Sequence, residues 1–450
     1  MTTARHYTQW SEAALRDAAA AAVERAVALG ADAASANVRA GGGVRFVARG
    51  GTIETRLRDG YQSLGVTVFR DGRNGSASAT ALDSASIARV AEEAVAIARR
   101  VEPDAGTGLA DRDWLAWDGA MPALDAGDQP EADELIATTT EIEAGAARHD
   151  AGVRVVEAGT TSQEALMALA TSDGFCRSAA SSLHGRWLVV MAQGAGGAMQ
   201  DHADGYERRL ADLPSAGALA AQAVTRATGR LGARAMPGGT MPVLFDPRVA
   251  PAIVGDLVGA LSGGSQERGT TFLRDAIGRA VAADHLDLIE DPSEPYGMAS
   301  GGFDAEGVAG SRRPVVEGGV ATGYFLATRS ARRLGMRSTG NANGPWNLSL
   351  RSRLPGGDLD AMLARLGDGL FVTHLLGGAT DPVTGNWTRA VAGFRVVGGR
   401  IDHPVIDVTV GGDLARMLHA IVAVGDDVER HGAIRSGSIL IDGMTVGGTA

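Results

Sequence analysis

The chain has 450 residues, 45% of them hydrophobic, and a formal net charge of -11 at pH 7, so it is long enough for two domains with packed cores. The mild acidic excess provides no positive patch for nucleic acid, and direct binding to DNA is not expected. All 42 basic residues are arginine, which excludes a Schiff-base lysine and a lysine-containing phosphate loop.

The N-terminus, MTTARHYTQWSEAALRD, lacks the apolar segment of a secretory signal, and no run of about 18 uncharged apolar residues predicts a membrane span. Cys176 is the single cysteine, so an internal disulfide is impossible, in agreement with a reducing compartment. We therefore expect a soluble cytoplasmic protein.

The first 100 residues predict a helix, then strands, then a helix. Ser11 is a suitable N-cap for a helix that ends at Gly30. Strand-like alternation begins at three places: Val44, Thr52 and Ser63. The third strand turns back at Asp71-Gly72, and a second helix follows Asp83-Ser84. One apolar stripe is expected on that helix, formed by Ile87, Val90, Ala94 and Ile97.

Residues 102–130 form a long connection without a clear period. It is either a packed surface loop or a cover over a groove or another subunit. Further strands are expected between residues 153 and 190, and a helix from about 215 to 231. Proline and glycine cluster in ARAMPGGTMP at 233–242, which indicates a boundary between domains at 1–235 and 236–450.

The second half contains apolar stretches broken by glycine pairs: PVVEGGVATGYFLA, AGFRVVGGRIDHPVIDVTVGGD and SILIDGMTVGG. Each of these stretches predicts two strands joined by a tight turn. Two helices are expected among them, at 247–261 after the Asp246-Pro247 start signal and at about 413–422. The fold class is α+β: an N-terminal mixed α/β domain with long strands and flanking helices, then a mostly antiparallel, barrel-like C-terminal domain with a few helices.

Local catalytic signatures are scarce. A hydrolytic zinc site needs two or three imidazole or carboxylate ligands and a general base, but no two histidines share a helical turn, and a site built from distant loops stays open. We assign a structural role to each of the nine: His6, His149, His184, His202, His285, His374, His403, His419 and His431. No G-x-S-x-G elbow or G-x-G-x-x-G dinucleotide loop occurs. Cys176 lies on a strand-like stretch, and we expect a buried, unreactive thiol.

Several motifs nevertheless resemble one family along nearly the whole chain. They are SLGVTVFRDGRNGSASAT at 63–80, LVGALSGGS at 257–265, FDAEGVAGSRRPVVEGGV at 303–320, SARRLGMRSTGNA at 330–342, and the C-terminal DVTVGGDLARML and GDDVERHGAIRSGSILIDGM. Together they resemble the TldD/PmbA family, once named modulators of DNA gyrase, and within it the PmbA branch, also called TldE.

The resemblance implies a role in a zinc metalloprotease made of a TldD-type and a TldE-type subunit, which degrades unfolded or short peptides and trims peptide precursors. TldD-type subunits carry a His-Glu-x-x-x-His helix and a C-terminal cysteine ligand. On this chain the three motif positions fall on Gly255, Asp256 and Ala260, and nothing after Cys176 is cysteine. Glycine and alanine offer no donor atom, and one carboxylate cannot hold zinc alone. We therefore expect a regular helix without metal.

Three functions compete. The first is a non-catalytic TldE-like subunit, a pseudoenzyme that needs a TldD-like partner; zinc is then expected only in that partner, and this chain has no cofactor. The second is a homodimeric peptide-binding or scaffolding protein, with a strand edge open to a client. The third is an enzyme with its own C-terminal site. In STGNANGPWN at 338–347, the candidates for a substrate groove are Ser338, Thr339, Gly340, Asn341 and Asn343, although a glycine-rich turn explains the stretch equally well.

Overall fold

A long, curved sheet dominates the first half of the molecule in this computed structural model, which describes residues 7–150, 152–194, 197–429 and 432–448. Its six strands lie in the order β3-β2-β1-β4-β5-β6, and every neighbouring pair is antiparallel. The bounds are β1 Ala33–Arg49, β2 Thr52–Arg70, β3 Arg73–Ala79, β4 Val153–Thr171, β5 Cys176–Gly194 and β6 Gly197–Glu207. β6 and β3 are therefore the edges of the sheet.

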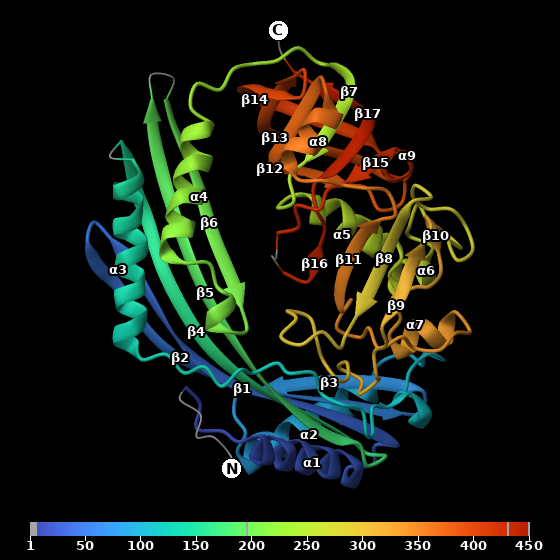
Figure 1. The fold of residues 1–450 in the computed structure, drawn as a ribbon. Helices are drawn as coiled ribbons and strands as arrows, with labels where there is room; N and C mark the ends of the chain where they lie inside the picture. Colours follow the sequence, from blue (N-terminus) through green and yellow to red (C-terminus); the bar gives the residue numbers. More distant parts are fainter. Residues whose placement is uncertain (1–6, 151, 195–196, 430–431, 449–450) are drawn as a thin grey trace.

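Four helices cover the convex face of this sheet (Figure 1). They are α1 Glu12–Ala28, α2 Ser84–Ala98, α3 Ala132–His149 and α4 Ala216–Gly229. α1 and α2 pack on one half of the sheet around Val38 and Val66, and α3 and α4 pack on the other half around Leu188 and Val190. The opposite, concave face is left to the second half of the chain.

The predicted N-terminal elements are largely confirmed. The Ser11 hydroxyl accepts a hydrogen bond from the Ala14 N–H at the start of α1, and Asp71 and Gly72 both have positive φ in the β2–β3 turn. The predicted stripe on α2 is wrong in part: Ile87 and Ile97 are only half-buried. The buried face of α2 consists of Val90, Ala91, Ala94, Val95 and Ala98.

The separate strands predicted from Thr52 and from Ser63 are one continuous strand, β2, and β1 begins at Ala33 and not at Val44. Both strands are longer than predicted because the glycine run in β1 does not interrupt pairing. On the concave face, aromatic rings lie over glycines directly opposite on the next strand. The pairs are Tyr61 over Gly41, Trp187 over Gly159 and Tyr206 over Gly185. A Cβ at any of these glycines would crowd the ring, so the aromatic side chains replace the missing contacts.

The second half of the chain forms two further sheets. A six-stranded sheet has the order β14-β13-β12-β7-β17-β15, and an additional β14–β17 pairing closes it into a barrel. Its strands are β7 Gly239–Phe245, β12 Gly369–Thr380, β13 Asn386–Val397, β14 Arg400–Asp413, β15 Ile421–Val424 and β17 Ile439–Gly447. A five-stranded sheet, β10-β9-β8-β11-β16, lies beside the barrel. It contains β8 Leu286–Asp291, β9 Arg313–Glu317, β10 Val320–Ala321, β11 Asn347–Ser352 and β16 Ile434–Arg435.

Short helices complete this domain: α5 Ala250–Ala260, α6 Gly263–Arg268, α7 Thr328–Arg333, α8 Leu359–Leu366 and α9 Leu414–His419. The hairpin turns predicted at Gly318-Gly319 and Gly398-Gly399 are confirmed. The third glycine unit is different, because SILIDGMTVGG forms one strand, β17, with a bulge between Ile441 and Met444. The helix predicted at 413–422 is too long, since Ile421 already belongs to β15.

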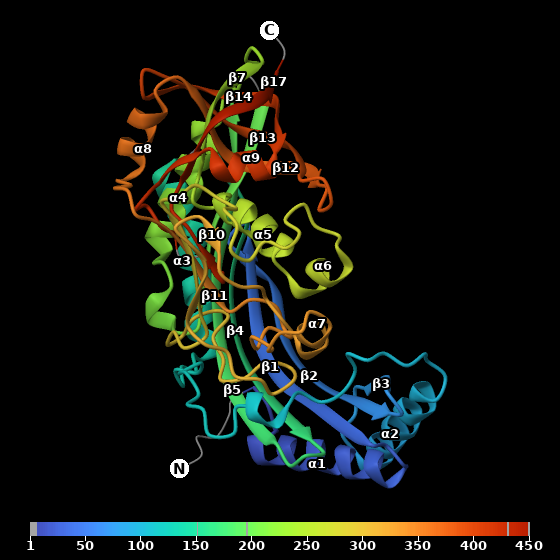
Figure 2. The same cartoon turned by 90° about the vertical axis from the view of Figure 1, so that its right-hand side faces the viewer.

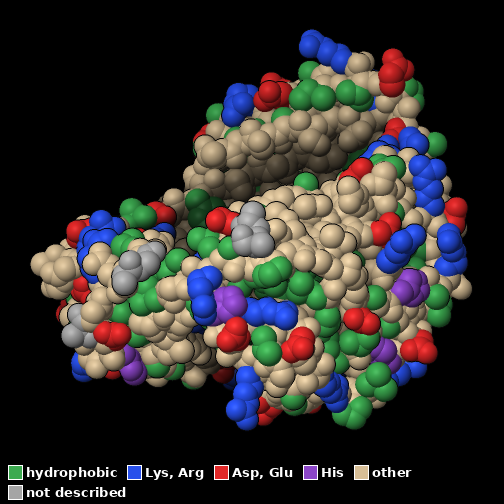
Figure 3. All heavy atoms as spheres, turned by 90° about the horizontal axis from the view of Figure 1, so that it is seen from above, with side chains coloured by type: hydrophobic (Ala, Val, Ile, Leu, Met, Phe, Trp, Pro, Cys, Tyr) green, Lys and Arg blue, Asp and Glu red, His purple; other side chains and the backbone are tan. Residues whose placement is uncertain are grey.

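The two halves of the chain meet at both ends of the concave face. At one end, residues 110–116 of the long connection pack with Phe175 and Phe303 in a shared apolar cluster. The connection contains one short 3-10 turn, Arg112–Trp114, and lies against the C-terminal domain of its own chain. At the other end, β6 meets the barrel through charged side chains. Seen from above, the surface of the molecule is hollowed (Figure 3).

No helix in the described part of the chain is long and apolar enough to cross a membrane.

Candidate functional site

The degenerate motif lies on α5, which follows β7 of the barrel. The expectation of a regular helix is confirmed, since Ala250–Ala260 is α-helical throughout. The start predicted at Asp246-Pro247 is wrong, because residues 247–249 form a turn and the Asp246 carboxylate accepts hydrogen bonds from the backbone N–H and the guanidinium of Arg248. The helix buries Ile253, Val254 and Leu257 in the core and leaves Gly255 and Asp256 half-buried.

Of the three motif positions, only Asp256 has a side chain that could bind a metal. Its carboxylate already accepts hydrogen bonds within the protein. One oxygen, Oδ2, accepts hydrogen bonds from Thr380 Oγ1 at 3.0 Å and from Trp387 Nε1 at 3.0 Å. The Arg389 guanidinium lies 3.5 Å from the same oxygen and stacks over the Trp387 ring. Asp256 therefore ties α5 to β12 and β13 as a structural carboxylate.

These residues do not fit zinc. Gly255 and Ala260 have no donor atom, and Asp256 is surrounded by hydrogen-bond donors and a cation, which compete with a metal for its lone pairs. Among the described residues no group of three or more histidine, cysteine, aspartate or glutamate side chains is placed to hold a metal ion.

Cys176 corrects one sequence-based prediction. The thiol is exposed, not buried, because Cys176 is the first residue of β5, where the β4–β5 turn meets solvent. Partial burial nevertheless raises the pKa of the thiol, against a smaller opposing effect of Arg16. A raised pKa leaves little thiolate at neutral pH, which agrees with the expected low reactivity.

The predicted groove residues lie in the turn that leads from α7 to β11, and most of them face inward. The Ser338 hydroxyl donates to the Leu326 carbonyl, and the Asn341 amide donates to the buried Glu290 carboxylate at 2.7 Å. Thr339 Oγ1 donates to Asn341 Oδ1, while Gly340 has a φ of 73° and packs on the backbone of residues 309–310. Their polar atoms thus bond within the domain.

Asn343 is the exposed member of that set, and its side-chain oxygen accepts a hydrogen bond from the Ala305 N–H. The structure therefore brings Ser338, Thr339, Gly340 and Asn341 together in one braced turn and leaves Asn343 at the surface. A peptide groove at these residues stays a prediction.

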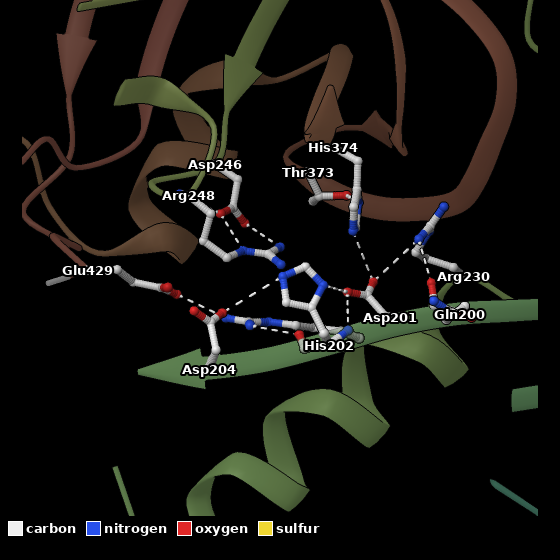
Figure 4. Close-up of polar contacts among 11 residues, drawn as sticks. Gln200, Asp201, His202, Asp204, Arg230, Asp246, Arg248, Thr373, His374 and Glu429 are labelled. Atoms are coloured by element: carbon white, nitrogen blue, oxygen red, sulfur yellow. Dashed lines mark hydrogen bonds and ion pairs between the residues drawn. The ribbon is translucent and has the colours of Figure 1, made fainter. Parts of the chain in front are cut away.

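Sequence reasoning missed a charged cluster between the two halves of the molecule (Figure 4). Asp201 on β6 lies at its centre: its Oδ2 is 3.1 Å from His374 Nε2 on β12 and 3.4 Å from Arg230 Nη1 after α4. Around this pair lie further charges from both domains: His202, Asp204, Arg226, Asp246, Arg248 and Glu429. These residues are far apart in the sequence and share no local motif, so no sequence signal identifies the cluster.

Burial alone would raise the pKa of Asp201, but the hydrogen bond and charge of His374, the His202 N–H and Arg230 together hold it at about 2. The carboxylate is consequently ionised at neutral pH, and it links the N-terminal sheet to the barrel. His374 Nδ1 lies 3.0 Å from Thr373 Oγ1, which completes a carboxylate, imidazole, hydroxyl chain. Thr373 is only 5% exposed, so its hydroxyl is closed to a substrate and the chain is a structural bridge.

Two other described histidines make hydrogen bonds of the structural kind assigned to them, and the assignment for the rest stays a prediction. His285 hydrogen-bonds Ser352 and the Ile421 carbonyl, and the buried His184 hydrogen-bonds Ser162. His6 and His431 lie outside the described residues.

Known proteins match this architecture along the chain. Three family models cover residues 34–98, 125–231 and 238–448, described respectively as PmbA/TldA metallopeptidase domain 1, central domain and C-terminal domain. "Metalloprotease PmbA" of Escherichia coli O157:H7 is 35% identical over 409 residues, which is 90% of each chain. The chain belongs to the PmbA/TldD family.

Other family members extend the comparison. The "Metalloprotease PmbA homolog" of Haemophilus influenzae is 33% identical over 440 residues and 97% of each chain. A crystal structure of a candidate modulator of DNA gyrase from Bacteroides thetaiotaomicron superposes with a TM-score of 0.88 at 22% identity, over 96% of this chain and 99% of that one. TldE from Thermococcus kodakarensis gives 0.83 at 16% identity, over 95% and 99%. These two structures share the PmbA/TldD fold found here.

Proposed function

We propose that this chain is the non-catalytic, TldE/PmbA-like subunit of a two-chain zinc metalloprotease that degrades unfolded peptides or processes peptide precursors. Its partner is a TldD-like chain that carries the His-Glu-x-x-x-His helix and the zinc. In this proposal the complex acts in the cytoplasm and has no direct contact with nucleic acid.

The observation that carries the proposal is the state of the motif helix. α5 keeps the position and packing of a barrel helix, yet Gly255 and Ala260 lack donors, and Asp256 binds Thr380, Trp387 and Arg389. Full-length matches to PmbA proteins named metalloproteases support a role in proteolysis. The chain has the fold of the family, but its motif helix is unsuited to bind a metal. This combination supports the role of a non-catalytic subunit.

The test is purification of this chain alone, of a TldD-like chain from the same organism alone, and of the two together. Zinc per chain and cleavage of unfolded casein, with and without chelator, are measured in all three. We expect zinc and chelator-sensitive cleavage to follow the TldD-like chain and a stable complex to form. The matched control is the same complex with the motif glutamate of the partner replaced by glutamine, which should be inactive.

One tightly bound zinc per isolated chain, or chelator-sensitive cleavage by this chain alone, would sink the subunit assignment. A homodimer that binds unfolded peptide and ignores the TldD-like chain would favour the scaffolding function instead.

A further inference from the structure

One end of the N-terminal sheet projects from the molecule as an arm, which consists of the β2–β3 turn, β3 and α2 (Figure 2). The long connection leaves α2 and runs from the arm to the C-terminal domain, where it reaches α7. The contacts of the connection therefore determine how the arm is held.

Asp104, near the start of the connection, touches both sides. Its backbone N–H donates to the carbonyl of Gly72 in the β2–β3 turn at 2.8 Å. Its side chain accepts from α7: Oδ2 is 2.7 Å from Arg329 Nε, and Oδ1 is 2.8 Å from Arg333 Nη2. A single residue thus joins the arm to the C-terminal domain.

A second carboxylate holds the same two arginines in place. Glu267 on α6 lies 3.1 Å from Arg329 Nη1 and 3.2 Å from Arg333 Nε. The Glu267 and Asp104 side chains are only 7% and 20% exposed, whereas those of Arg329 and Arg333 are 50% and 42% exposed. Two carboxylates and two guanidinium groups therefore form a balanced network, which is stronger than isolated surface pairs.

The backbone around Asp104 favours its charged form. The Gly106 N–H donates to Asp104 Oδ1 at 2.9 Å. This bond, together with those from Arg329 and Arg333, holds the pKa of Asp104 well below its usual range. Gly106 itself packs against Arg329, where a Cβ would be crowded by the Arg329 carbonyl. Glycine at residue 106 lets the connection lie close to α7.

Farther along, the connection is held in a different way. Leu115 and Ala116 pack with Phe175 and Phe303, and Leu115 pairs with Val308 through a β-bridge. This apolar anchor does not depend on charge. Asp113 also pairs with Arg337 at 3.1 Å, but both side chains are largely exposed. Asp111 also pairs with Arg332 of α7 at 2.6 Å. The contact at Asp104 is thus electrostatic, whereas beyond residue 110 an apolar anchor is combined with charged contacts.

We propose that Asp104, Arg329, Arg333 and Glu267 form a charge clamp that holds the arm against the C-terminal domain. Screening or removing the Asp104 charge frees the start of the connection from α7, so the arm is held less tightly and at a greater average distance, while the apolar anchor at Leu115 stays in place and α2 stays packed on the sheet. Salt acts on the clamp because the guanidinium groups are half-exposed and the screening length falls from about 8 Å at 0.15 M to about 3 Å at 1 M. The clamp does not depend on the proposed function.

The test measures the distance between spin labels on the arm and on the C-terminal domain of the full chain. Cys176→Ser removes the native thiol, and Ala85→Cys and Ile277→Cys add two exposed labelling positions. The clamp variant is Asp104→Asn. Arg329→Gln with Arg333→Gln tests the same contact from α7. The matched control, Asp113→Asn, removes a carboxylate from the same connection outside the clamp. Circular dichroism verifies the fold of each variant.

At low salt we expect one narrow distribution of label distances for the labelled chain with an unmodified clamp, and the same for its Asp113→Asn variant. Asp104→Asn and the double arginine variant shift it to longer, broader distances. High salt shifts the unmodified clamp in the same direction and has little further effect on Asp104→Asn. Identical distributions for Asp104→Asn and the unmodified clamp at all salt concentrations would overturn the proposal. So would an equal shift in Asp113→Asn.

Discussion

At the scale of single residues, Asp256 on the motif helix keeps a carboxylate although the neighbouring motif positions offer no metal ligand. Asp256 stands where the resemblance places a glutamate, but its neighbours are Thr380, Trp387 and Arg389. Trp387 is fully buried, so its indole N–H needs this acceptor. The carboxylate is thus explained by the hydrogen-bonding needs of the barrel wall.

Restoring the motif alone should not create a protease. For the triple variant Gly255→His, Asp256→Glu and Ala260→His we expect weak zinc binding, a lower melting temperature and no peptide turnover. Ligands without partners that orient them typically lose about 10- to 100-fold in affinity or activity. A Cβ at Gly255 has room, its nearest neighbour being Ile434 Cδ1 at 3.9 Å. The strain therefore comes from the buried Ala260, where a larger side chain costs about 1 to 3 kcal/mol.

Zinc titration, calorimetry and casein hydrolysis check this expectation, with Ala260→Leu alone as the control for added bulk at the buried position. Robust hydrolysis by the triple variant without a partner would mean that a complete catalytic groove already exists in this chain.

Asp304 should make the protein less stable as pH rises through the mildly acidic range. Burial raises its pKa from 3.8 to about 6, against the N–H groups of Ala342, Glu306 and Val308 that favour the charged form. Since the folded pKa lies above the unfolded one, the stabilisation is complete below about pH 4 and is lost as pH rises through about 6. The loss relative to Asp304→Asn is at most about 3 kcal/mol.

Urea unfolding of both proteins between about pH 4 and pH 7 measures this difference. Asparagine also loses the acceptor for the Ala342 N–H at every pH, so the slope with pH, and not the offset, is the test. Parallel stability curves for the two proteins would contradict it.

At the scale of elements, the concave face of the N-terminal sheet depends on glycine beneath aromatic rings. Gly159→Ala should destabilise the protein by about 1 to 3 kcal/mol, because the new methyl group overlaps the Trp187 ring. Gly60→Ala on β2 is the matched control, since a Cβ there meets only the Gly41 carbonyl at 3.6 Å. Chemical unfolding followed by tryptophan fluorescence compares the two. Equal stability would show that the ring moves aside freely.

Elements with strong local signals were predictable, and those stabilised by tertiary polar contacts were not. α1 and the β2–β3 turn follow from a cap and from Asp71-Gly72. α3 went unpredicted because its core face contains Thr139, bonded to Thr160, and Glu143, bonded to the Gly51 N–H. Such polar residues hide the apolar period of a helix. The candidate site shows the same limit: the motif positions were readable, whereas the partners of Asp256 come from strands more than a hundred residues away.

At the scale of the whole molecule, the Asp201 cluster couples two domains with separate cores. Asp201→Asn should destabilise the protein by about 3 to 5 kcal/mol, because it removes the buried carboxylate that pairs with Arg230 and lies 3.1 Å from His374 Nε2. Calorimetry should then separate one unfolding transition into two. Asp204→Asn, which alters a partly exposed neighbour, is the control. A single, unshifted transition in Asp201→Asn would show that the domains are coupled elsewhere.

The division of α5 into a packing face and a half-buried face has an evolutionary consequence. Ile253, Val254 and Leu257 anchor the helix in the core, while a side chain at the half-buried Gly255 would have room. A substitution at Gly255 therefore changes chemistry at little cost to folding, whereas Asp256 is needed by the Trp387 indole. A duplicated ancestral gene could lose its metal ligands in one copy and still produce a well-folded chain, free to specialise as the companion of the copy that kept them.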